Sequence, residues 1–101
     1  MNNIIDLNNW NNIKNKHKIY LVYIYSKITD NIQYNNFMNN IKEKIDKGVK
    51  LYKIDVQNQE LVDALDITSY PCIWLFNNGV KKNEYFLSSE NLLLNDISFL
   101  S

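Results

Sequence analysis

Cys72 is the residue of this sequence with the most reactive side chain, and it is the only cysteine in the chain. A single cysteine excludes an internal disulfide, a Cys-x-x-Cys redox pair and a zinc site built from several cysteines. As a candidate reactive thiol, Cys72 would form a mixed disulfide with a partner or with glutathione, and it would need an external thiol to turn over. The alternative is a small apolar residue that opens a buried strand, because free cysteine is among the most buried residue types.

The other residue types that carry out catalysis are not arranged for it. His17 is the only histidine, and it lies between two lysines with no nucleophile or carboxylate at a suitable spacing, so we interpret it as a surface residue. The six serines lie outside nucleophile-elbow contexts, and two glycines are too few for a phosphate-binding loop. Four carboxylates are interpreted as the solvated face of a short helix rather than a metal site: Asp55, Glu60, Asp63 and Asp66. We therefore expect no catalytic residue, no metal and no cofactor.

The composition narrows the classes of partner. Eleven lysines balance eleven acidic residues and arginine is absent, which disfavours nucleic-acid binding. The apolar runs are much shorter than the about 20 residues of a membrane span, and the first residues lack a signal-peptide pattern, so we expect no membrane association. Together with the lone thiol, this favours a cytoplasmic or other reducing intracellular compartment. The chain is also asparagine-rich, with eighteen Asn beside thirteen Ile, which we attribute to an AT-rich source genome because the codons of Asn, Ile and Lys are AT-rich.

The length of 101 residues supports one domain, residues 1–101. Hydrophobic patterns and turn residues predict strands over residues 4–5, 19–25, 49–56, 72–76 and 84–87. They predict helices over residues 7–16, from Thr29 or Asp30 to residue 47, over 57–65, and from Ser88 or Ser89 to residue 100, with Gly48 ending the second helix. The order β-α-β-α-β-α-β-β-α indicates an α/β fold, with a central mixed β-sheet flanked by helices on both faces.

Two segments of the sequence carry a family resemblance. YKIDV at residues 52–56, followed by NQEL at 58–61, resembles the third strand and next helix of thioredoxins. DITSYPCIWLFNNG at residues 66–79 resembles the cis-proline loop, fourth strand and hairpin turn, and its Ser-Tyr-Pro is most similar to the domains of disulfide isomerases. The resemblance covers residues 4–100 and implies a thioredoxin-like fold.

The paired cysteines of that family are missing. Alignment places their positions at Thr29 and Ile32, or one residue earlier at Ile28 and Asn31. The residues of this vestigial active-site loop cannot exchange disulfides: Ile28, Thr29, Asp30, Asn31 and Ile32. By the resemblance, the disulfide oxidoreductase activity is therefore not expected.

Three further positions bear on the resemblance. Tyr23 stands where thioredoxins carry a buried acid that assists proton transfer. Leu87 lies near the position of a glycine that leaves room for the backbone of a substrate. Lys53, in contrast, matches a lysine that the family has near its site.

The resemblance also implies a peptide-binding loop formed by Ser69, Tyr70, Pro71 and Cys72. A cis bond before Pro71 would expose the backbone of Tyr70 to an extended partner strand. Alternatively, Pro71 only stiffens the loop, if Leu87 or the start of the second helix fills the groove.

Three functions follow from this sequence. The first is a redox-inactive binding module that holds a protein or peptide partner in the groove beside the proline loop. The second is a single-cysteine redox or glutathione-linked sensor that uses Cys72. The third is a purely structural domain, and in each case we expect a monomer or a weak homo-oligomer.

Overall fold

The computed structural model describes residues 1–28, 32–86 and 89–100. It has the predicted order of helices and strands, and the predicted α/β fold class is confirmed. The elements are β1 (Asn2–Asn3), α1 (Leu7–Ile13), β2 (Ile19–Tyr25), α2 (Ile32–Lys44), β3 (Lys50–Asp55), α3 (Gln59–Ala64), β4 (Cys72–Asn77), β5 (Val80–Tyr85) and α4 (Glu90–Leu100).

The strands form one mixed sheet in the order β1-β3-β2-β4-β5. β1 and β2 both run parallel to β3, whereas β4 runs antiparallel to β2 and β5 antiparallel to β4. β2 is the central strand and its first six residues are buried. This position explains its sequence, because a strand covered on both faces needs an uninterrupted apolar and aromatic run.

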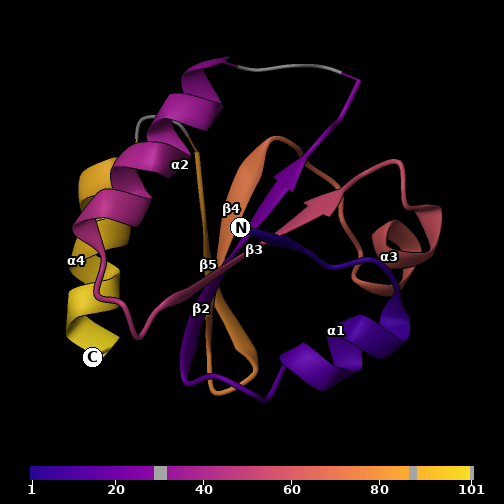
Figure 1. Cartoon of the computed structure of the whole chain (residues 1–101), viewed down its shortest axis with the longest axis horizontal. Coiled ribbons are helices and arrows are strands. Elements are labelled where there is room, and N and C mark those ends of the chain that lie inside the picture. Colours follow the sequence, from indigo (N-terminus) through magenta and orange to yellow (C-terminus); the bar gives the residue numbers. More distant parts are fainter. Residues whose placement is uncertain (29–31, 87–88, 101) are drawn as a thin grey trace.

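Two helices cover each face of the sheet: α1 and α3 lie on one side, and α2 and α4 on the other (Figure 1). Alternate residues of β2 therefore enter different cores. Tyr20, Val22 and Ile24 pack in the core under α1 and α3. Ile19, Leu21 and Tyr23 pack in the core under α2 and α4.

The first strand lies two residues earlier than predicted. Asn2 and Asn3 pair with β3, whereas Ile4 is buried and Ile5 is exposed. The prediction placed the strand at the apolar pair of residues 4–5. It could not detect β1, because β1 pairs through its backbone and both of its side chains are exposed.

The hairpin strand β5 begins at Val80 rather than at residue 84. Asn78 and Gly79 both have positive φ angles, of 54° and 80°. They form a two-residue turn, so that Asn77 already pairs with Val80. β5 therefore follows the turn without a gap.

The second helix ends at Lys44, earlier than predicted. Gly48 is therefore not the residue that terminates it. Gly48 belongs to a separate turn, in which its N–H donates to Asp46 Oδ1 at 3.1 Å. The predicted caps Thr29, Asp30 and Ser88 lie outside the described residues, and Ser89 accepts the N–H of Leu93 at the start of α4.

Candidate functional site

One edge of the sheet brings together the segments that the sequence analysis selected. Ile24, near the end of β2, pairs with Cys72 at the start of β4, and Ile73 pairs with Tyr85 at the end of β5. The chain therefore leaves β2 toward residues 28–32, enters β4 from residues 69–71 and leaves β5 at this same edge. We call it the site edge.

Large apolar side chains are exposed along the site edge. Ile28 is 78% exposed and Ile32 is 68% exposed, on either side of residues 29–31, which lie outside the described residues. Tyr70 is 55% exposed, and Phe86 is exposed just beyond β5. Burying such side chains against a partner would be favourable, since apolar surface is transferred out of water.

The proline loop leads directly into β4. The bond between Tyr70 and Pro71 is cis. Ser69 and Tyr70 are exposed, whereas the next residue after the proline, Cys72, is fully buried. The side chain of Tyr70 lines a hollow of about 340 Å³ together with residues of α3 and its flanking segments: Val56, Gln57, Gln59, Val62 and Ile67.

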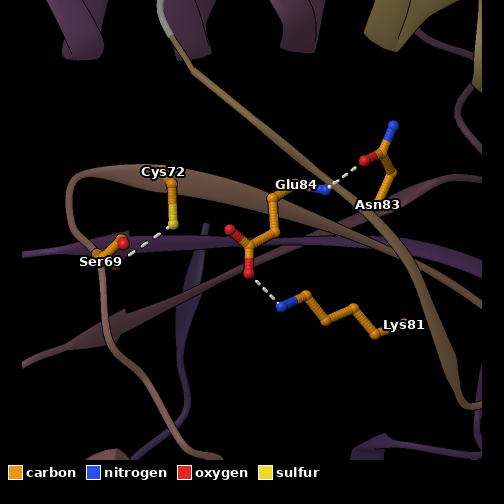
Figure 2. Close-up of polar contacts among 5 residues, drawn as sticks. All are labelled: Ser69, Cys72, Lys81, Asn83 and Glu84. Carbon is orange, nitrogen blue, oxygen red and sulfur yellow. Dashed lines mark hydrogen bonds and ion pairs between the residues drawn. The ribbon is translucent and has the colours of Figure 1, made fainter.

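Cys72 lies close to an ion pair formed by two residues of β5. Its Sγ donates to the carbonyl oxygen of Ser69 at 3.4 Å. Figure 2 shows the carboxylate of Glu84 between this thiol and the ammonium group of Lys81, with which Glu84 forms an ion pair. Lys81 Nζ also lies 4.0 Å from the ring centroid of Trp74.

This environment favours the neutral thiol. Burial raises the pKa of Cys72 to about 11, the negative charge of Glu84 acts in the same direction, and the positive charge of Lys81 opposes them. Since the thiolate is the nucleophile in disulfide exchange, the described geometry holds Cys72 in its unreactive form.

A stack of tyrosines occupies the place where the family resemblance would put a buried acid. The ring centroid of Tyr23 lies 5.4 Å from that of Tyr25 and 6.2 Å from that of Tyr34. Lys53 Nζ lies 5.4 Å from the centroid of Tyr25. The lysine that the family resemblance selected therefore contacts an aromatic ring in this protein.

His17 lies at the other end of β2 and is half-buried, so its interpretation as a plain surface residue was incomplete. Its Nε2 is 2.7 Å from the hydroxyl of Tyr52. Burial lowers the pKa of His17, and the positive charges of Lys16 and Lys50 lower it further. These contacts give His17 a structural role away from the site edge.

Three of the four carboxylates near α3 accept hydrogen bonds within the chain. Asp55 accepts the backbone N–H groups of Lys27 and Gln57, and Glu60 accepts the N–H of Leu7. Asp63 accepts from the side chain of Gln59. In the part of the chain that the structure describes, no group of three or more His, Cys, Asp or Glu residues could hold a metal ion.

Sequence reasoning missed Glu84 and Lys81 as neighbours of Cys72. The turn at Asn78 and Gly79 fixes only the start of the hairpin register, and an irregularity between Leu75 and Phe76 shifts it by one residue, which places Glu84 opposite Trp74. The prediction that β5 starts at residue 84 concealed this pairing. The sequence analysis also missed that the buried Tyr85 donates its hydroxyl to Asp96 and so joins β5 to α4.

The sheet order, the two helical layers and the proline loop that leads into β4 define a thioredoxin-like α/β protein. Residues 3–98 match the sequence model of the family described as Thioredoxin, and the chain belongs to that family. With one cysteine, it lacks the Cys-x-x-Cys pair.

Several solved thioredoxins share the fold. A mutant thioredoxin from Halobacterium salinarum is 20% identical, with a TM-score of 0.78 over 98% of this chain and 88% of that chain. The thioredoxin of Trypanosoma brucei brucei is 14% identical, with a TM-score of 0.80 over 97% and 88% of the two chains. That of Fasciola hepatica is 16% identical, with a TM-score of 0.78 over 100% of both. No curated protein matches the chain.

None of the helices within the described residues is long and apolar enough to cross a membrane.

Proposed function

We propose that this chain is a redox-inactive thioredoxin-like binding module that holds an extended segment of a protein or peptide at the site edge. The observation that carries the proposal is the exposure of Ile28, Ile32 and Tyr70 around the proline loop. Exposed apolar side chains that gather at one place are typical of an interaction surface.

The backbone of Tyr70 supports a strand-like mode of binding. Within the described residues, its N–H and C=O have no hydrogen-bond partner. An extended peptide could pair with both groups, and such main-chain bonds give affinity while side-chain pockets give specificity.

The hollow beside Tyr70 supplies a pocket for one side chain of the partner. Its lining combines the aliphatic side chains of Val56, Val62 and Ile67 with the amides of Gln57 and Gln59. No charged residue is among the described residues that line it. We therefore expect it to accept a neutral side chain.

The sensor alternative finds less support, because a thiol that is fully buried and has a pKa of about 11 is a poor nucleophile near neutral pH. The alternative in which the groove is filled by Leu87 rests on a residue outside those described. A reducing compartment fits the lone buried thiol, and we propose a monomer or a weak homo-oligomer.

The proposal is tested with peptides selected on the wild-type protein from a random phage-displayed library. Synthetic copies of the enriched peptides are then titrated against wild type, Tyr70→Ala and Ile28→Ala. We expect each substitution to weaken binding about fivefold or more, because truncating a central interface residue commonly costs at least 1 kcal/mol.

Phe99→Ala is the matched control, because Phe99 is equally apolar and 89% exposed but lies near the end of α4. It should leave the affinity unchanged. Enriched peptides that bind Tyr70→Ala and Ile28→Ala as tightly as wild type would contradict the proposal, as would a library from which nothing is enriched.

A further inference from the structure

A second hollow lies at the opposite end of the sheet, where α2 ends and β3 begins. Lys50 there pairs with Tyr20 near the start of β2, whereas the site edge adjoins the pairing of Asp55 with Tyr25. The hollow has a volume of about 320 Å³. We call it the basic trough, and the residues that matter for its chemistry are Lys42, Lys47, Lys50, Ile45, Val49 and Leu51.

The lysines of the basic trough are free to bind an anion. Lys42, Lys47 and Lys50 are exposed, and none forms an ion pair with any residue in the described ranges 1–28, 32–86 and 89–100. Asp46 is the acid that lines the trough, and its Oδ1 accepts the N–H of Gly48 within the turn. The trough therefore has an excess of positive charge, although the whole chain has none.

The floor of the basic trough is apolar. Val49 is buried, and Ile45 and Leu51 are partly buried members of the core under α2 and α4. Ligand sites commonly combine such an apolar surface with a few charged groups that fix the orientation of the ligand. The three lysines and the apolar floor together favour a ligand that has an apolar group with negative charges on either side of it.

We propose that the basic trough binds an acidic segment of a partner protein, whose carboxylates pair with the three lysines and whose one apolar side chain rests on the floor. The trough is concave, so it suits a side chain that projects from a partner, whereas a membrane-binding surface inserts projecting side chains of its own. The described residues that line it include neither arginine nor an aromatic residue, so they offer no bidentate contact to phosphate and no ring that stacks on a base. The site is separate from the site edge and does not depend on the function proposed there.

The test uses a fluorescent peptide in which glutamates flank one central leucine, titrated with the full chain and followed by anisotropy. Binding should be detectable at about 20 mM salt and weaken severalfold by about 200 mM, because exposed charges are screened. Replacing the leucine by serine should also weaken binding severalfold, since the apolar anchor is lost.

The decisive variant is the double charge reversal Lys42→Glu with Lys50→Glu, which should weaken binding about tenfold or more. Its matched control is Lys27→Glu with Lys82→Glu, which changes the net charge equally at two exposed lysines outside the trough. The control should bind within about twofold of wild type, as should Tyr70→Ala, and circular dichroism verifies that every variant is folded.

Equal losses in the double reversal and in its control would overturn the proposal, because the peptide would then be responding to net charge alone. An affinity that stays the same when the leucine is replaced by serine would also overturn it. So would a preference, dependent on Lys42 and Lys50, for oligo-dT or for phosphatidylserine vesicles over the acidic peptide.

Discussion

At Cys72, burial and the negative charge of Glu84 both raise the pKa of the thiol. The side chain has lost contact with water, and the carboxylate of Glu84 further disfavours a negative charge on sulfur. Lys81 opposes this effect but is itself paired with Glu84. Cys72 is therefore held as a neutral thiol by its fold and by its neighbours on the hairpin.

The raised pKa of Cys72 makes stability depend on pH in the alkaline range. Because the pKa rises from 9.0 to about 11 on folding, the native state retains its proton longer than the unfolded state. The stabilisation is complete below pH 9 and is lost as the pH rises toward 11. Relative to Cys72→Ala, wild type should lose about 2 kcal/mol of unfolding free energy by pH 10.5.

Urea unfolding of the two proteins at a series of pH values measures this difference. Cys72→Ala is the right reference, since every other titrating group remains. Parallel pH profiles would show that the thiol titrates alike in both states and would refute the argument.

The effects of Glu84 and Lys81 on the pKa of Cys72 can be tested separately. Glu84→Gln should lower the pKa of Cys72, and native-state alkylation by iodoacetamide should therefore become faster than in wild type. Lys81→Met should raise the pKa and slow the reaction. Both substitutions break the ion pair between Lys81 and Glu84. If the loss of this pair made Cys72 more accessible, alkylation would become faster in both variants. Acceleration in both variants would contradict the electrostatic explanation.

At the level of the elements, the hairpin between β4 and β5 depends on a glycine. Gly79 has a φ of +80°, and a Cβ there would lie 2.3 Å from Asn15 Oδ1 and 3.1 Å from the carbonyl oxygen of Lys14. Gly79→Ala should therefore lower the free energy of unfolding by about 2 kcal/mol, through both the left-handed backbone and the close approach.

Gly48→Ala is the matched control, because a Cβ at Gly48 meets only Asp46 Oδ1, at 3.8 Å. It should change stability by less than about 0.5 kcal/mol. Equal effects of the two substitutions in urea denaturation would contradict the role assigned to Gly79.

The sequence predicts the buried elements better than the exposed ones. β2 is visible because its burial on both faces demands the continuous run of residues 19–25. β5 is not, because Lys81, Lys82 and Asn83 are exposed on an edge strand, and the register of its pairing with β4 shifts at this point. The effect of the Glu84 charge on the pKa of Cys72 depends on that pairing, so a site prediction from residue types alone could not find it.

Across the whole molecule, one sheet separates two cores that share its strands. Trp10 and Trp74 belong to the core under α1 and α3, whereas the long helices α2 and α4 cover the other core. Since β2 contributes alternate residues to both, neither core should persist without the other. Tryptophan fluorescence and far-ultraviolet circular dichroism should therefore report the same urea midpoint.

A fluorescence transition that precedes the loss of helical signal would contradict this coupling. It would mean that the core under α1 and α3 opens as a unit of its own.

The central claim is that the site edge of this thioredoxin family member serves to bind a peptide. The most direct measurement is the change in amide chemical shifts when a library-selected peptide is titrated into the isotope-labelled chain. We predict the largest changes at the amides of Ile28, Ile32, Ser69, Tyr70 and Cys72. Changes confined to α4 or to the basic trough would contradict the claim.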